Sequence, residues 1–366
     1  MYNQPNSLES VVKSIVPVDQ TWIDKAKERS AQLLMPYRAL GKLHVYAEKL
    51  CGIYKTLSPK INRKSVIIMA GDHGVAQEGV SAYPQDVTGA MVQTFLHGGA
   101  GINAFARKIN ADVWVVDTGI IPDIQINPHE LAKLDKKYQI RIEKVGKGTA
   151  NMTKVPAMTL EQAEQSVMTG FRIASEMIAT GVELFATGDM GIGNTTPSAA
   201  IGAVIIQAPI DKMVGRGTGI DDERLVHKKK MITQSISLHQ PDRTNALDVL
   251  SKIGGFEIGG IAGVILAGAY HQRPVVIDGL ISTAGALIAH TLCPHILDYV
   301  FSGHCSEEPG HQVMLQYLNL EPILNLGMRL GEGTGAALAM GIIDSAVAMF
   351  TEMMTFDQMY QMVGHT

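Results

Sequence analysis

The sequence is poor in aromatic and charged residues. Aromatic side chains make up 5% of the 366 residues and charged side chains 18%, against 46% hydrophobic residues. A core of this composition must be built mainly from aliphatic side chains, with backbones packed closely at some of the 37 glycines. The length suits one large domain, or one large and one small domain.

Cysteine is also scarce, and Cys51, Cys293 and Cys305 are widely spaced without a CxxC pair. This spacing argues against a disulfide framework and against a structural zinc site. The net charge of −4 provides no global positive field that would attract nucleic acid. The N-terminus lacks a signal-peptide pattern, and the apolar stretches 258–270 and 334–350 contain glycines and polar residues. We therefore expect a cytoplasmic protein with no membrane or nucleic-acid partner.

Short apolar runs alternate with segments of helical length. Strands are predicted at 65–70, 112–117, 139–144, 182–187, 274–278, 296–301 and 322–326. Helices are predicted between them at 88–109, 160–180, 195–207, 259–271 and 281–292. Uninterrupted apolar strands alternating with helices indicate an α/β fold with a mostly parallel, doubly wound sheet. In such sheets ligands bind beyond the carboxyl ends of the strands.

The two ends of the chain have a different pattern. Helical segments separated by prolines are predicted at 7–16, 18–34 and 37–50, and the stretch 334–363 is mostly helical. We expect residues 1–60 and 345–366 to form a small helical subdomain. The α/β nucleotide-binding and catalytic core is then expected at 61–344.

The segment GDMGIGNTTP at 188–197 follows a predicted strand and precedes a predicted helix. Gly191 and Gly193 permit positive φ and close approach of a ligand, and the free N–H groups of the next helix attract an anion. A tight turn between strand and helix would need the same glycines, so both interpretations stay open. The third glycine of GxGxxG is absent, which argues against an ordinary Rossmann dehydrogenase.

A second glycine-rich segment, GMRLGEGTGA at 327–336, also follows a predicted strand. Glu332 lies there between two glycines. It is either a first-turn carboxylate stabilised by the helix dipole or a general base held at the edge of the sheet. In the second interpretation, Arg329 would bind an anion.

Three further segments allow both structural and functional interpretations. The segment SGHCSEEPGH at 302–311 has no recognised metal-ligand spacing, so a loop that contacts phosphate is a competing hypothesis to a metal site. Asp72 and His73 follow the first predicted strand and are either a catalytic pair or turn scaffolding. The segment GRGTG at 215–219 is either a flexible loop or a segment that closes over a ligand with Lys228.

Several of these segments, in this order, resemble one family. They are 70–75 (AGDHGV), 79–88 (GVSAYPQDVT), 188–196 (GDMGIGNTT), 215–219 (GRGTG), Asp278-Gly279, 302–311 (SGHCSEEPGH) and 329–336 (RLGEGTGA). Together they are similar to nicotinate-nucleotide–dimethylbenzimidazole phosphoribosyltransferases, which act in assembly of the lower ligand of cobalamin. The resemblance spans roughly residues 60–340.

The resemblance implies a Rossmann-like α/β core, a homodimer and a reaction without a metal or other cofactor. A nitrogen of a benzimidazole-type base attacks C1′ of nicotinate mononucleotide, nicotinate leaves, and the configuration inverts from β to α. Glu332 matches the family's general base. The positions implied in binding the nucleotide and its phosphate are Asp189, Gly191, Gly193, Asn194, Thr195, Lys228, Ser306, Arg329 and Gly331, and those implied in the base pocket are Ser81, Tyr83 and Met91.

The sequence departs from the family pattern at Asp189, because many relatives have a glutamate at this position. The identity of the acceptor base is also open, since a relative that attaches adenine or a phenolic base would share the fold. Two other functions stay open as well. One is a non-catalytic nucleotide-binding relative, and the other is a metal-dependent hydrolase that uses His304, Cys305 and His311.

Overall fold

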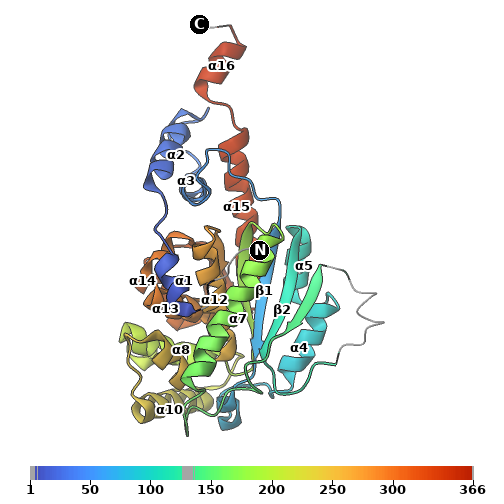
Figure 1. The fold of residues 1–366 in the computed structure, drawn as a ribbon, viewed down its shortest axis with the longest axis vertical. Helices are drawn as coiled ribbons and strands as arrows, with labels where there is room; N and C mark the ends of the chain where they lie inside the picture. Colours follow the sequence, from blue (N-terminus) through green and yellow to red (C-terminus); the bar gives the residue numbers. More distant parts are fainter. Residues whose placement is uncertain (1–4, 6, 126–134, 136, 365–366) are drawn as a thin grey trace.

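The computed structural model describes residues 5, 7–125, 135 and 137–364, and a parallel β-sheet lies at its centre (Figure 1). Its seven strands are β1 (Lys64–Gly71), β2 (Ala111–Gly119), β3 (Tyr138–Ile142), β4 (Leu184–Met190), β5 (Val275–Ile277), β6 (Val300–Ser306) and β7 (Pro322–Met328). They are ordered β3-β2-β1-β4-β5-β6-β7, and all neighbours pair in parallel. The order reverses between β1 and β4, the topological switch point of a Rossmann-like sheet. The predicted fold class is confirmed.

Helices cover both faces of the sheet (Figure 1). Helices α12 (Phe256–Tyr270) and α13 (Leu280–Leu292) contact the strands on one face, and α7 (Leu160–Ala179) packs outside α12. On the other face lie α4 (Val87–Leu96), α5 (Gly101–Lys108) and α15 (Thr334–Glu352). All eight residues of β1 are buried, as expected for a strand covered on both sides.

Glycine brings the backbones of α7 and α12 into direct contact. A Cβ atom added at Gly170 would lie 1.9 Å from the carbonyl oxygen of Gly260, and one at Gly263 would lie 1.9 Å from that of Val167. No side chain fits at these two positions, because real Cβ atoms essentially never come within 3.0 Å of another heavy atom. This packing explains how a core poor in aromatic residues fills its volume.

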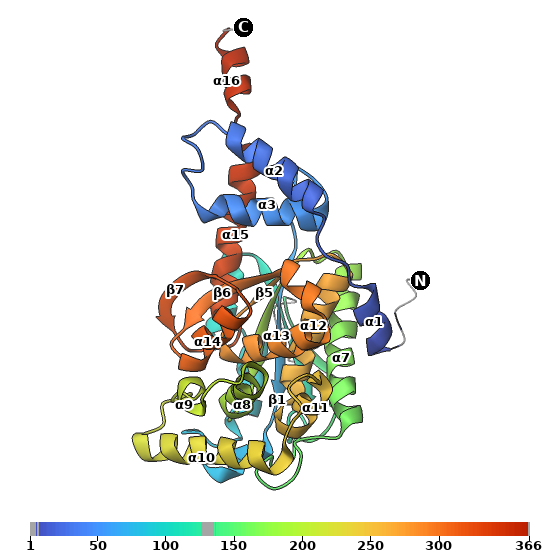
Figure 2. The ribbon, with the colours of Figure 1, turned by 90° about the vertical axis from the view of Figure 1, so that its left-hand side faces the viewer.

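Two helices near the N-terminus pack beside the carboxyl-terminal half of α15 (Figure 2). Helices α2 (Gln20–Gln32), α3 (Lys42–Tyr54) and α15 share a separate apolar cluster that includes Ala26, Cys51 and Phe350. Helix α16 (Phe356–Met362) projects beyond it and has no buried residue. Helix α1 (Leu8–Ser14) instead places Leu8 and Val11 in the main core. The division into 1–60 plus 345–366 and 61–344 stays a prediction.

Helix α15 also differs from the other helices in composition. Among the residues that the structure describes, it is the one helix long and apolar enough to cross a membrane, and 56% of its apolar stretch is buried within the protein. It packs against α3, α5 and four strands of the sheet.

The remaining helices connect these layers. They are the short 3₁₀ helices η1 (Gly74–Glu78) and η2 (Pro294–Asp298), and α8 (Thr195–Ile206), α9 (Ile210–Met213), α10 (Asp222–His239), α11 (Ala246–Ile253) and α14 (Pro309–Tyr317).

Two predicted elements differ from the structure. The predicted strand 296–301 is wrong in its first half, because η2 occupies Pro294–Asp298 and β6 begins only at Val300. Pro294 favours the first position of a helix, and its fixed φ outweighs the strand-like apolar run that follows. The predicted helix 88–109 is divided into α4 and α5, since Gly98 at φ +72° breaks the helical path.

Candidate active site

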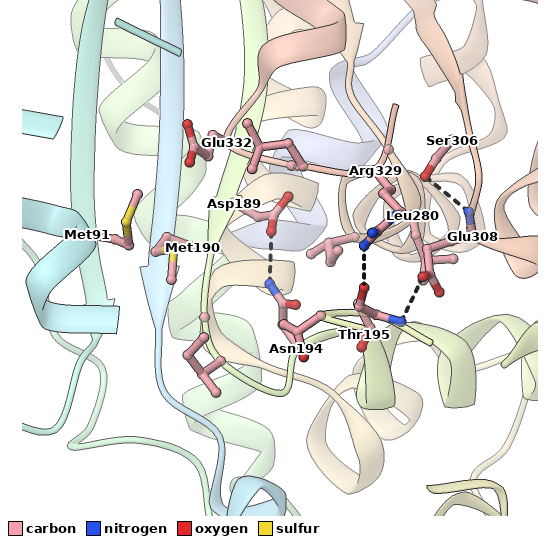
Figure 3. A pocket seen from close by; sticks show the side chains of 18 of the residues that line it. Met91, Asp189, Met190, Asn194, Thr195, Leu280, Ser306, Glu308, Arg329 and Glu332 are labelled. Carbon is pink, nitrogen blue, oxygen red and sulfur yellow. Dashed lines mark hydrogen bonds between the residues drawn. The ribbon is translucent and has the colours of Figure 1, made fainter. Parts of the chain in front are cut away.

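A pocket of about 370 Å³ lies at the carboxyl edge of the sheet, beyond β4, β6 and β7. Its lining residues are Tyr83, Val87, Met91, Asp189, Met190, Gly191, Ile192, Asn194, Thr195, Gly217, Thr218, Gly279, Leu280, Ile281, His304, Ser306, Glu308, Arg329, Leu330, Gly331 and Glu332. In Figure 3, Glu332 and Met91 lie on one side of Asp189, and Ser306, Glu308 and Arg329 lie on the other. The pocket therefore has one end with an acid and an apolar side chain, and another with polar and cationic groups.

The backbone at Glu332 is strained. Gly331, Glu332 and Gly333 all have positive φ, at +83°, +64° and +86°. For a residue other than glycine this region costs roughly 1–2 kcal/mol, so the fold must hold Glu332 in place. Asp278 helps to fix this turn, because its carboxylate accepts hydrogen bonds from the N–H groups of Gly333 at 3.2 Å and Ala336 at 2.9 Å.

The carboxylate of Glu332 is buried at the amino end of α5. Its Oε2 accepts a hydrogen bond from the N–H of Ile102 at 3.1 Å, and only 6% of the residue is exposed. Burial raises the pKa of Glu332, while the N–H groups of Ile102 and Gly101 oppose that shift. A glutamate whose pKa is shifted towards neutrality, with its conformation fixed, has the properties that a general base needs.

Asp189 lies at the end of β4, between the two ends of the pocket. Its Oδ2 accepts a hydrogen bond from Asn194 at 2.8 Å, while Oδ1 has no hydrogen-bond partner in the described part of the chain. Burial, and after it the charge of Asp278, raises the pKa of Asp189 to about 8. Burial also raises the pKa of Asp278 to about 7. Both carboxyl groups are therefore weaker acids in the folded protein than a free aspartic acid is.

The polar end of the pocket is built on the amino end of α8. Thr195, the first residue of that helix, accepts a hydrogen bond from Nζ of Lys228 at 2.7 Å. Lys228 is 1% exposed, and burial lowers its pKa to about 8. A helix amino end beside a buried lysine and Arg329 is suited to an anion such as a phosphate.

The structure brings most of the predicted site residues to one pocket. Those that line it are Asp189, Gly191, Asn194, Thr195, Ser306, Arg329, Gly331 and Glu332, together with Tyr83 and Met91. Gly193, Lys228 and Ser81 do not line it. Gly193 forms the left-handed part of the turn before α8, at φ +91°, and the Ser81 hydroxyl lies 3.2 Å from that of Thr218. The roles assigned to all of these residues stay predictions.

The segment 302–311 is not the loop that its sequence suggested. Ser302–Ser306 belongs to β6, and His311 is in α14. Nδ1 of His311 accepts from the N–H of Ser306 at 2.9 Å, so Nε2 carries the proton and donates to Thr283 at 3.0 Å. Burial lowers the pKa of His304 to about 4 and that of His311 to about 3. Within the described residues, no three His, Cys, Asp or Glu side chains are grouped to hold a metal, so the hydrolase hypothesis has no ligand set there.

His73 pairs with an acid that sequence reasoning missed. Its Nε2 lies 2.8 Å from Oε1 of Glu257, in the first turn of α12, and both side chains are buried. Burial lowers the pKa of His73, but Glu257, Asp72 and Asp189 together raise it above its usual value. The adjacent Asp72 instead accepts from the N–H of Ile121 at 2.8 Å. No local signal links His73 to Glu257, since 184 residues separate them.

Glu308 lies within the segment 302–311, where the sequence suggested it only as a possible metal ligand. Its Oε1 accepts from the N–H of Gly217 at 2.8 Å, which ties the segment 215–219 to the wall of the pocket. The sequence marks it only as one acid of an adjacent pair, without indicating which of the two points inward.

The fold and the pocket are those of an α/β phosphoribosyltransferase, and the phosphoribosyltransferase family model matches residues 15–359. A curated relative from Syntrophotalea carbinolica is 48% identical over 96% of this chain and 98% of its own length, and one from Geotalea uraniireducens is 46% identical over 96% and 97%. Both are named nicotinate-nucleotide–dimethylbenzimidazole phosphoribosyltransferase. The crystal structure of CobT from Thermus thermophilus matches with a TM-score of 0.86 and 41% identity, covering 93% of this chain and 98% of that one. The chain belongs to the nicotinate-nucleotide–dimethylbenzimidazole phosphoribosyltransferase family.

Proposed function

We propose that this protein transfers the phosphoribosyl group of nicotinate mononucleotide to 5,6-dimethylbenzimidazole or a related base. The products are α-ribazole 5′-phosphate and nicotinate, and the reaction belongs to assembly of the cobalamin lower ligand. Family membership supports the reaction type. The observation that carries the proposal is Glu332, a buried carboxylate in a strained turn that faces the pocket.

The chemistry needs one base and no acid. The pyridinium nitrogen of the nucleotide already carries a positive charge, so nicotinate departs without being protonated. Its departure builds oxocarbenium character on the ribose, which a nearby carboxylate stabilises electrostatically. The incoming base becomes cationic as it forms the new bond, and Glu332 takes its N–H proton.

The two ends of the pocket suit the two substrates. We assign the acceptor base to the end with Glu332 and Met91, and Tyr83 adds apolar surface to the same pocket. The phosphate is placed at the end with Thr195, Ser306 and Arg329. Lys228 then acts on the phosphate through Thr195 or by direct contact after a small movement. Asp189 lies between these ends (Figure 3), so this arrangement would put the ribose beside it.

The state of the protein is part of the same proposal. We infer a homodimer in the cytoplasm, with the terminal segments 1–60 and 345–366 as a helical subdomain. No metal or redox cofactor is required, because the leaving group is already activated and no water needs to be acidified.

Product analysis tests the function directly. The purified protein is incubated with nicotinate mononucleotide and a panel of bases, and the products are separated, identified by mass and assigned as α or β anomers by NMR. We expect an α-linked riboside phosphate with benzimidazole bases. Cleavage to ribose phosphate without attachment to any base would indicate a hydrolase, and binding without cleavage would indicate a non-catalytic relative.

A further inference from the structure

The segment Gly215–Gly219, which we call the strap, lies along the pocket between α9 and α10. Gly217 and Thr218 line the pocket. On its other side is a second cavity of about 470 Å³, lined partly by Gly215, Arg216 and Gly219. The strap thus separates two hollows, and Glu308 and Arg329 border both of them.

At the phosphate end, the strap is held through its backbone. The N–H of Gly217 donates to Glu308 at 2.8 Å, and Arg329 donates to the carbonyl oxygen of Gly217 at 3.4 Å. Nζ of Lys228 donates to the carbonyl oxygen of Gly215 at 3.3 Å. The residues that border the proposed phosphate position therefore also set the position of the strap.

On the side of the segment 81–83, the strap is held by one side chain. Oγ1 of Thr218 accepts a hydrogen bond from the N–H of Ala82 at 2.9 Å and lies 3.2 Å from the hydroxyl of Ser81. Tyr83, the next residue, lines the pocket. The position of the base-pocket segment thus depends on the strap through the hydroxyl of Thr218.

The backbone path of the strap requires glycine at two positions. Gly217 and Gly219 have φ of +52° and +101°, a region in which glycine has no steric penalty. A Cβ atom at Gly217 would lie 2.8 Å from the hydroxyl of Thr195, so glycine also permits close contact with the start of α8.

We propose that Thr218 is a positioning residue that couples the nucleotide site to the base site. A phosphate that engages Arg329 and Lys228 fixes the strap, and Thr218 then holds Ser81-Ala82 so that Tyr83 is in place for the acceptor base. Each substrate should therefore strengthen binding of the other by the same factor, because coupling between two sites is reciprocal. This inference rests on the proposed function, since it requires a nucleotide and a base in one pocket.

The test compares Thr218→Val, which keeps the shape but loses the hydroxyl, with Thr218→Ser, which keeps the hydroxyl. Initial rates over a grid of nicotinate mononucleotide and dimethylbenzimidazole concentrations give both KM values, kcat and the coupling factor. Thr233→Val is the matched control, because Thr233 is an exposed threonine of α10 whose hydroxyl bonds only within its own helix at Lys229.

We expect Thr218→Val to raise the KM for the base at saturating nucleotide by about two- to tenfold, as for loss of one or two neutral hydrogen bonds. The coupling factor should fall towards one, while kcat changes less than KM does. Thr218→Ser should restore the coupling, and Thr233→Val should match the wild type. Equal coupling in Thr218→Val, Thr218→Ser and the wild type would overturn the proposal. Absence of product from the wild type would instead refute the proposed function.

Discussion

Replacing Glu332 by glutamine is the most direct test of the general base. Glutamine has the same shape, and its carbonyl oxygen can still accept the hydrogen bond from the N–H of Ile102 that Glu332 accepts at 3.1 Å. A neutral acceptor is weaker than a charged one by about 1 kcal/mol. That loss is offset in part, because burial already disfavours the ionised carboxylate in the folded protein. The thermal unfolding temperature should therefore change by only a few degrees.

The effect on catalysis should be much larger. Loss of a general base costs about 10²–10⁴ in rate, equivalent to roughly 3–5 kcal/mol of transition-state stabilisation. The assay measures kcat by separation of nicotinate and the α-riboside phosphate, and measures nucleotide affinity by calorimetry. Affinity for nicotinate mononucleotide should stay within about threefold of the wild type. Glu161→Gln, the same change at an exposed position on α7, serves as the control.

A particular result would refute this reasoning. If Glu332→Gln turned over dimethylbenzimidazole at close to the wild-type rate, the carboxylate would not be the base. The strain at φ +64° would then have to be explained by the packing of the turn alone.

Three other predictions concern the phosphate contacts, the pKa of Asp189 and the need for a metal. Lys228→Ala and Arg329→Ala should each weaken nicotinate mononucleotide binding about ten- to hundredfold, by loss of a charge-assisted contact; equal weakening towards the dephosphorylated riboside would show that neither residue binds the phosphate. Burial raises the pKa of Asp189 to about 8 in the folded protein against its usual value of 3.8, so this group contributes stability below about pH 4 that is lost as pH rises to about 8. The unfolding temperature of Asp189→Asn should therefore rise relative to that of the wild type between about pH 5 and pH 8.5. A difference in unfolding temperature that stays constant over this range would contradict the pKa shift. Dialysis against a strong chelator should leave the rate unchanged, whereas loss of activity that one divalent ion restores would revive the metal-dependent hydrolase.

The local sequence was sufficient to predict the layout of the fold and the position of the acid. Apolar runs without alternation indicate strands covered on both faces, and these predict a parallel sheet whose carboxyl edge binds ligands. Glu332 can also be singled out from the sequence, because the glycines on both sides of it indicate a backbone path that an ordinary turn does not need. The resemblance added the identity of the reaction, which these patterns alone left open.

The features that the sequence did not predict depend on contacts between segments that are far apart in the chain. The start of β6 was misplaced because Pro294–Asp298 and a buried strand share the same apolar composition, and only the surrounding packing selects a 3₁₀ helix. Glu257 reaches His73 across 184 residues, and Thr218 reaches Ala82 across 136. Such pairings depend on which strands are neighbours and on how loops cross the sheet edge. The sequence therefore determined which groups could do chemistry, and the tertiary structure decided which of them meet, because burial and distance set their pKa values and contacts.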